Sequence, residues 1–156
     1  MKISADNLTS FAAAILVHAG AGPDAARRVA TRLVGANLTG HDSHGVGMIP
    51  AYVEGIMAGQ LDPGAEARLV RENGPFLLVD GQQGFGHIIA EQAMDMAIQR
   101  ARDSQIAVLS LRNSFHLGRL ADWGAMAAEA GFICIIYANV QTAQPLVAPF
   151  GGSDGR

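Results

Sequence analysis

The chain has 156 residues, of which 49% are apolar and 16% are charged, so it can form a core and is not of the disordered class. Its net charge of −3 argues against nucleic acid or an anionic membrane as a partner. No apolar run approaches the ~20 residues that cross a bilayer, and the first residues lack a signal-peptide pattern. The single cysteine, Cys134, excludes an internal disulfide, and we expect a cytoplasmic protein with a buried, inert thiol.

The first part of the sequence predicts two helices. Ser4 is placed to cap a helix over residues 5–18, where apolar side chains recur every three or four positions. Pro23 suits the first turn of a second helix, which Gly40 is placed to end. Three arginines lie mostly off the apolar stripe of the second helix, and we expect them on a solvated face: Arg27, Arg28 and Arg32.

A polar, glycine-rich loop over residues 40–47 precedes a third helix. Asp42 or Ser43 is placed to cap this helix, and Pro50 is compatible only with its first turn. Residues 67–80 then contain two extended runs around a Gly-Pro turn, which predicts a hairpin.

The remaining elements alternate between helix and strand. The pattern predicts helices over residues 87–104 and 120–130 and strands over residues 106–111 and 132–138. We therefore expect an α/β fold, in which a helical N-terminal part packs on a mixed α/β layer. The boundary is expected near residue 66, with residues 67–156 forming an incomplete cofactor and substrate domain.

The turn between the second predicted strand and the next helix carries the clearest candidate for chemistry. It reads Asn-Ser-Phe-His-Leu-Gly-Arg over residues 113–119. A histidine such as His116 can exchange protons near neutral pH, and Gly118 permits close approach of a ligand. The helix N-terminus that follows offers free N–H groups to an anion. The alternative is a turn whose histidine only caps or packs.

The other motifs leave two interpretations each. Residues 84–90 match a dinucleotide fingerprint, but residues 81–83 separate it from the strand, so a glycine-rich entry to a packed helix is the alternative. His41 and His44, with Asp42 between them, have a metal-like spacing, but no Cys or Glu lies at a supporting spacing, and we expect a ligand-facing loop with no metal. We expect His18 and His87 at surface or capping positions and Trp123 in the core.

The chain resembles a known enzyme family in three ordered motifs. Residues 37–52 read N-L-T-G-H-D-S-H-G-V-G-M-I-P-x-Y and resemble the N-terminal signature of the malate/L-lactate/ureidoglycolate dehydrogenase family. Residues 113–118 and residues 147–152, V-A-P-F-G-G, resemble two later signatures. The resemblance runs from about residue 4 to residue 156, and within the family it is strongest to the bacterial hydroxycarboxylate dehydrogenase B type.

The resemblance implies an activity, a cofactor and site residues. Members interconvert 2-oxoacids and 2-hydroxyacids with NAD(H) or NADP(H), on a fold that is not of the Rossmann type, and they form homodimers. The resemblance implies that His116 is the proton donor or acceptor. It also implies that His44 and the backbone around Gly118, Arg119 and Leu120 lie at the nicotinamide cofactor.

The sequence departs from the family pattern at two points. Met48 stands where many members carry an arginine that binds a substrate carboxylate, which disfavours malate and leaves Arg119 as the substitute. Ser43 is the other residue expected on the substrate side. Because family members are considerably longer, we expect a truncated N-terminal portion of such an enzyme. The alternative is a catalytically inactive dimerisation or binding module derived from one.

Overall fold

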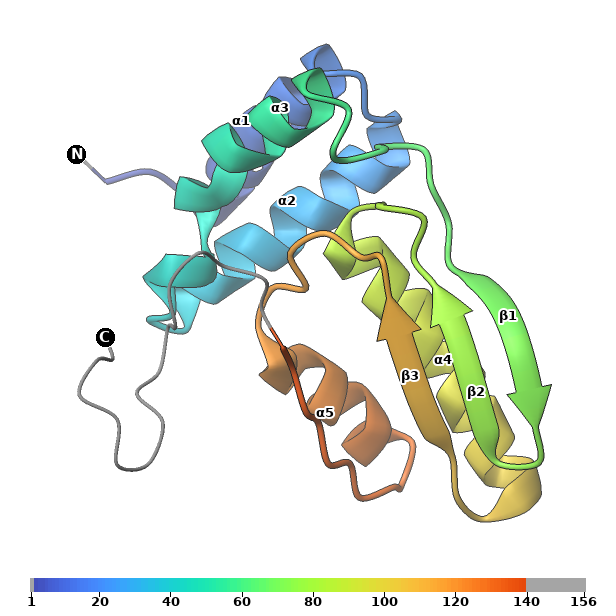
Figure 1. Cartoon of the computed structure of the whole chain (residues 1–156). Helices are drawn as coiled ribbons and strands as arrows, with labels where there is room; N and C mark the ends of the chain where they lie inside the picture. The colour runs from blue at the N-terminus through green and yellow to red at the C-terminus, as the bar shows by residue number, and fades with distance from the viewer. Residues whose placement is uncertain (1, 140–156) are drawn as a thin grey trace, which may run out of the picture.

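The computed structural model describes residues 2–139. Figure 1 shows three N-terminal helices on one side of the molecule and a three-stranded sheet on the other, with one helix behind the sheet and one beside it. This arrangement confirms the expected α/β class, with a helical N-terminal part packed on a mixed α/β layer.

The first two helices begin and end where the sequence predicts. Helix α1 (Ala5–His18) starts after Ser4, whose side-chain oxygen accepts a hydrogen bond from the Asn7 backbone N–H at 3.3 Å. Helix α2 (Pro23–Leu38) has its proline in the first turn and is followed by Gly40 in the left-handed region. The contact between the two helices buries apolar side chains from both: Ala12, Leu16, Val29 and Leu33.

Two short 3-10 turns, η1 (Asp42–His44) and η2 (Val46–Met48), lead into helix α3 (Ile49–Met57). The prediction that Asp42 or Ser43 caps this helix is wrong, because α3 begins later and has no side-chain cap. The Asp42 carboxylate instead accepts a hydrogen bond from the side-chain amide of Asn37 at 2.6 Å, which closes the loop. Pro50 does lie in the first turn of α3, as predicted.

The sheet has the order β1-β2-β3 and comprises β1 (Arg68–Asn73), β2 (Phe76–Asp80) and β3 (Val108–Arg112). Strands β1 and β2 form the predicted antiparallel hairpin, whereas β3 is parallel to β2. A parallel pair needs a crossover connection, and helix α4 (Gly86–Ser104) provides it. The side chains of Leu77 and Val79 are buried on the sheet, at 4% and 0% exposure.

One continuous core joins the helical part to the start of α4. It contains Leu33 of α2, Tyr52 of α3, and Phe85 and Ile88 at the beginning of α4. The N-terminal turn of α4 is therefore held between the two parts of the fold.

Helix α5 (Leu120–Glu129) is attached through its tryptophan. Trp123 is 3% exposed, which confirms its predicted core position, and its indole N–H donates to the Leu117 carbonyl oxygen at 3.1 Å. Arg32 of α2 lies over the indole ring at 5.2 Å and pairs with Glu91 of α4 at 3.3 Å, while Arg28 pairs with the same carboxylate at 3.1 Å. The expectation of a merely solvated face is therefore wrong for these two arginines.

The predicted strand over residues 132–138 is not formed. A strand needs a neighbour that pairs with its backbone groups, and this segment pairs with no strand among the described residues. Ile133 and Tyr137 are 97% and 92% exposed, and Cys134 is half-buried where a buried thiol was expected. The V-A-P-F-G-G motif at residues 147–152 lies outside the described residues. Over residues 2–139, none of the helices is both long and apolar enough to cross a membrane.

Candidate active site

The loops that follow β2 and β3 continue side by side beyond the ends of the strands. The backbone N–H groups of Gly81 and Gln83 donate to the carbonyl oxygens of Arg112 and Asn113, at 2.8 and 2.6 Å. The Phe115 N–H then donates back to the Gly84 carbonyl oxygen at 3.1 Å. These hydrogen bonds fix the backbone from the carboxyl end of β3 to Phe115, and His116 is the residue that follows.

A buried carboxylate lies where these hydrogen-bonded loops begin. Asp80, at the end of β2, accepts hydrogen bonds from the Gln82 backbone N–H at 3.0 Å and from the Asn113 side-chain amide at 3.1 Å. The Arg112 guanidinium donates to the same carboxylate at 3.2 Å. The hydrogen bond from Gln82 is the main cause that lowers the pKa of Asp80, so the group stays ionised. Sequence analysis did not single out Asp80, although an aspartate at the carboxyl end of a β-strand was the available signal.

Two glycines bring His116 against α4. A Cβ atom added to Gly86 would lie 2.1 Å from the His116 carbonyl oxygen, and one added to Gly118 would lie 2.3 Å from His87 Nε2. Gly118 is also left-handed, with φ of +69°. Both positions therefore require glycine, and the turn that carries His116 packs directly on the N-terminus of α4.

His44 reaches the same place from the helical part. The side-chain oxygen of Asn37 accepts a hydrogen bond from the Val46 N–H at 2.9 Å, and its side-chain amide holds Asp42, so η1 and η2 are both tied to α2. The rings of His44 and His116 then lie 5.0 Å apart between centroids, although the two residues are far apart in sequence. Both residues are half-buried.

His87 is a third histidine at this centre, and its predicted surface or capping position is wrong. It is 2% exposed because it lies in the first turn of α4 on the side that faces Gly118 and Tyr52. Its ring centroid lies 6.2 Å from that of His116. His18, in contrast, is exposed, and its ring contacts the carbonyl oxygen of Ala14 at 2.8 Å, as expected of a histidine near a helix end.

Burial makes the three central histidines weak bases. The pKa of His116 is lowered to about 4, mainly by desolvation and to a smaller extent by the neighbouring His44. Desolvation and the charge of His116 lower the pKa of His87 to about 3, and burial also lowers the pKa of His44. The rings of His87 and His116 are therefore neutral near pH 7.

Tyr52 of α3 is a buried residue that contacts His116 and the aromatic rings around it. Its side chain is 1% exposed and packs against the rings of Phe85, Phe115 and His87. The Tyr52 hydroxyl lies 2.8 Å from His116 Nδ1, within hydrogen-bond distance. Burial raises the pKa of Tyr52, so the phenol keeps its proton. Sequence analysis assigned Tyr52 no chemical role.

The remaining predicted site residues lie around this centre. The Arg119 guanidinium donates to the Thr39 hydroxyl and to the Asp122 carboxylate, and its buried Nε has no partner among the described residues. Leu120 follows Arg119 as the first residue of α5. Ser43 is exposed, with its hydroxyl 2.9 Å from His44 Nδ1, and Met48 is half-buried at the end of η2.

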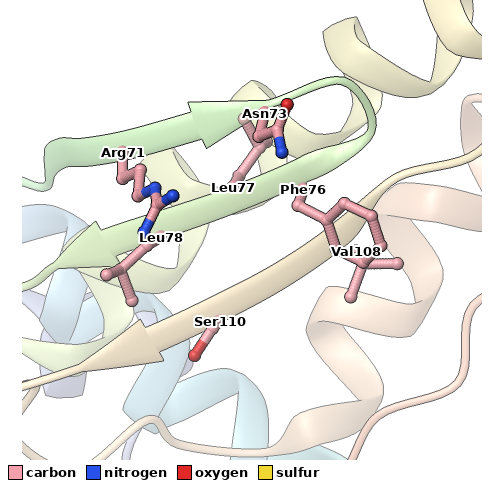
Figure 2. Close-up of a pocket in the computed structure, with 7 residues that line it drawn as sticks. All are labelled: Arg71, Asn73, Phe76, Leu77, Leu78, Val108 and Ser110. Carbon is pink, nitrogen blue, oxygen red and sulfur yellow. The ribbon is translucent and has the colours of Figure 1, made fainter.

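Two other features do not contribute to this centre. His41 contacts His44 edge-on at 4.5 Å between ring centroids, but no group of three or more potential metal ligands occurs within residues 2–139. A depression of about 290 Å³ on the sheet, drawn in Figure 2, is lined by residues of β1, β2 and β3 such as Phe76, Leu78 and Val108 and contains none of the predicted site residues. The dinucleotide-fingerprint alternative is not supported, because residues 81–85 separate β2 from α4, so the strand does not lead directly into the glycine that begins the helix.

Comparison with known proteins identifies the family of this chain. The model of the malate/L-lactate dehydrogenase family matches residues 3–156. Hydroxycarboxylate dehydrogenase B of Escherichia coli is 41% identical over 99% of this chain, and L-lactate dehydrogenase of Cupriavidus necator is 36% identical over 100%. The chain spans 43% and 45% of the lengths of these two relatives.

A solved Escherichia coli structure, described as of malate/lactate dehydrogenase type, superposes on the whole chain with a TM-score of 0.85. It is 37% identical, and the match covers 43% of that protein. The family model matches nearly the whole sequence, and the chain therefore belongs to the malate/L-lactate dehydrogenase family.

Proposed function

We propose that the chain forms part of an oxidoreductase that interconverts 2-oxoacids and 2-hydroxyacids with NAD(H) or NADP(H). The observation that carries this proposal is the pair of half-buried histidines, His44 and His116, whose rings lie 5.0 Å apart next to the N-terminus of α5. Membership of the family supports the reaction class, since its relatives are named as hydroxycarboxylate, malate and L-lactate dehydrogenases.

In the proposed reaction, His116 exchanges the proton of the substrate oxygen. Oxidation of a 2-hydroxyacid releases a hydroxyl proton, and an imidazole with a pKa of about 4 is neutral near pH 7 and free to accept it. Reduction of a 2-oxoacid reverses this transfer, and the imidazolium donates its proton to the carbonyl oxygen. His116 is half-buried, and its burial is the main cause that keeps the imidazole neutral.

We propose that the cofactor binds beside η1 and the N-terminus of α5, where it would contact four residues: His44, Gly118, Arg119 and Leu120. This place fits an anionic group, because the buried Nε of Arg119 lacks a partner among the described residues and α5 begins without a side-chain cap. NAD(H) or NADP(H), when bound, supplies or takes the hydride. The chain itself contributes the cation, the free backbone N–H groups and the imidazole that lines the site.

Ser43, Met48 and Arg119 are proposed for the substrate side. The exposed Ser43 hydroxyl lies beside His44, and Met48 provides an apolar surface for the substrate side chain. Arg119 is the cation for a substrate carboxylate, but its guanidinium already binds Thr39 and Asp122. Binding a carboxylate there would therefore require Arg119 to exchange one of these partners or to use its free Nε.

A direct assay follows NADH and NADPH absorbance with pyruvate, oxaloacetate, 2-oxoglutarate and phenylpyruvate. We expect turnover of at least one 2-oxoacid, and His116→Gln should lower kcat by about 100-fold or more, because it removes the proton carrier. His18→Gln, which changes an exposed histidine of α1, is the matched control and should leave kcat unchanged. If no 2-oxoacid is turned over, or if His116→Gln behaves like the control, the proposed function is wrong.

The second candidate is a catalytically inactive dimerisation or binding module. The observation that favours it is the exposure of large apolar side chains, including Met57 at 81%, Ile133 at 97% and Tyr137 at 92%. For either candidate we propose a homodimer located in the cytoplasm. Sedimentation tests the dimer, and calorimetry with NADH and NADPH separates the two candidates, since micromolar binding would contradict the inactive module.

A further inference from the structure

The edge of the sheet at β3 and the apolar stretch after α5 are two unpaired surfaces of the described chain. We infer that β3 and residues 132–138, the 132–138 segment, bind an additional β-strand together with a layer that covers the open face of the sheet. The donor is the portion of the family's enzymes that this chain does not span. The inference is independent of the proposed reaction, because binding and hydrogen exchange test it without turnover.

The backbone of β3 has one side without a partner. The Val108 N–H donates to the backbone just before β2 at 2.9 Å, and the Arg112 carbonyl oxygen accepts from the Gly81 N–H at 2.8 Å. In a parallel pair, alternate residues of a strand turn their backbone groups toward the same neighbour. Leu109 and Leu111 therefore turn their N–H and C=O groups away from β2. No strand lies on that side of β3 in the part of the chain that the structure describes.

One face of the sheet is apolar and open. The buried side chains of β2, Leu77 and Val79, alternate with Phe76 and Leu78, which therefore lie on the other face. Phe76 and its neighbour Val108 on β3 are 56% and 45% exposed, and both line the depression in Figure 2. Parallel strands occur almost only in sheets that are covered on both faces. Residues 2–139 thus supply a helix for one face of this sheet and nothing for the other.

The 132–138 segment has an unused apolar side. Ile133, Ile135 and Tyr137 are 97%, 75% and 92% exposed. The residues between them are more buried, with Cys134 half-buried and Ile136 at 37% exposure. An alternation with a period of two is typical of a β-strand that packs on one side only. The sequence of the segment therefore suits a strand, although its backbone pairs with no other strand within residues 2–139.

The order of the elements explains why the two surfaces belong together. Helix α5 follows β3 and contacts α4, and the 132–138 segment follows α5. A strand, a helix and a further extended stretch in this order form a right-handed crossover when the two strands share a sheet. The 132–138 segment nevertheless bonds to no strand among the described residues. One donated strand between β3 and this segment would supply the missing hydrogen bonds to both.

The length of the relatives identifies the donor. The chain spans 43% of hydroxycarboxylate dehydrogenase B of Escherichia coli, so more than half of that enzyme lies outside the match. The superposed Escherichia coli structure likewise extends well beyond this chain, which covers 43% of it. In such relatives the fold described here is continued by further polypeptide, which can supply a strand and a covering layer. A second copy of this chain is the competing occupant, and its binding would depend on the concentration of the chain alone.

Hydrogen exchange of the 156-residue chain alone, followed by NMR, tests the open edge. We expect the N–H groups of Leu109 and Leu111 to exchange rapidly, whereas that of Val108 is protected by its bond at the β2 side. Protection of Leu109 and Leu111 in the chain alone would overturn the inference. If that protection grows with chain concentration, the occupant of the edge is a second copy.

Co-expression tests the donor. The 156-residue chain is produced together with the tagged C-terminal portion of Escherichia coli hydroxycarboxylate dehydrogenase B, which starts where its match to this chain ends. We expect a complex with equal amounts of the two polypeptides, in which exchange slows by about 100-fold or more at Leu109, Leu111, Ile133 and Ile135. The N-terminal portion of the same enzyme is the control and should leave these four amides unprotected. Absence of a complex, or a complex without this protection, would overturn the inference.

Two lysine variants locate the contact. Ile133→Lys and Met57→Lys each replace a highly exposed apolar side chain, at 97% and 81% exposure, and both should leave the circular dichroism of the chain alone unchanged. Ile133→Lys should weaken the complex by about tenfold or more, because an isoleucine side chain is no longer buried there. Met57→Lys, on α3, should leave the affinity unchanged. Equal effects of the two variants would contradict a contact at the 132–138 segment.

Turnover separates this inference from the proposed function. A complex that protects the four amides but reduces no 2-oxoacid would contradict the proposed function and leave the inference standing. Turnover without protection of these amides would support the proposed function and overturn the inference.

Discussion

Replacement of Gly86 by alanine tests how the site is assembled. Gly86 is the first residue of α4, and an added Cβ atom would lie 2.1 Å from the carbonyl oxygen and 2.4 Å from the carbonyl carbon of His116. Ordinary contact begins at 3.4 Å, so the two backbone segments must separate by 3.4 − 2.1 = 1.3 Å. Neither atom belongs to a flexible side chain that could move aside.

The expected change in the free energy of unfolding is the difference between two opposing effects. Forcing an extra methyl group into a packed region typically costs about 1–3 kcal/mol, whereas alanine in place of glycine in a helix returns at most about 1 kcal/mol. We therefore expect Gly86→Ala to lower the free energy of unfolding by about 1–2 kcal/mol. Because the displaced backbone carries His116, any dehydrogenase activity should fall by about 100-fold as well.

Urea unfolding followed by circular dichroism measures this difference. Gly35→Ala in α2 and Gly124→Ala in α5 are matched controls, since an added Cβ would meet no atom within 4 Å at either position. Both should raise the free energy of unfolding by roughly 0.5–1 kcal/mol through the lower backbone entropy of the unfolded chain. If Gly86→Ala shifts the urea midpoint upward as the controls do, the close packing of α4 on His116 is refuted.

Three further changes have defined outcomes. Burial lowers the pKa of His87 to about 3 from an unfolded value of 6.5, so between pH 3 and pH 6.5 the unfolded state binds more protons than the folded state. The contribution of His87 to the free energy of unfolding should therefore be complete above about pH 6.5 and should fall by roughly 2–3 kcal/mol by about pH 4.5. Thermal unfolding at a series of pH values will measure this change. His87→Leu should reduce the slope of that profile and leave the part that arises from the lowered pKa of His116, whereas His18→Gln should not change it. Ser4→Ala should destabilise the chain by about 1 kcal/mol through loss of the α1 cap, and an unchanged melting temperature would contradict this role. Asn37→Leu should leave α2 intact but release the loop of His44, which hydrogen exchange at the Val46 N–H would report as loss of protection.

Regular elements were predictable from the sequence because their causes are local. Ser4, Pro23 and Gly40 bounded the first two helices, and the turn around Gly74 produced the hairpin. The strand predicted over residues 132–138 was wrong because pairing depends on a neighbour, which an apolar pattern alone does not supply. The proposed division of the chain near residue 66 stays a prediction.

The candidate site was predictable only where a motif marks it. His44 and His116 lie in motifs that stand out in the sequence, and the structure brings them together. His87 and Tyr52 were missed because each lies on an apolar-patterned helix, where a histidine or tyrosine resembles any other packed side chain. Their contribution arises from contacts between α3, α4 and the turn after β3, which sequence spacing does not reveal.

The paired loops after β2 and β3 limit how this region can vary. Because backbone groups at positions 81, 83 and 84 bond to those at positions 112, 113 and 115, the residue-by-residue correspondence between the two loops is fixed by hydrogen bonds. An insertion or deletion of one residue in either loop would break the correspondence and rotate the imidazole away from its neighbours. Natural variants should accordingly keep both loop lengths constant.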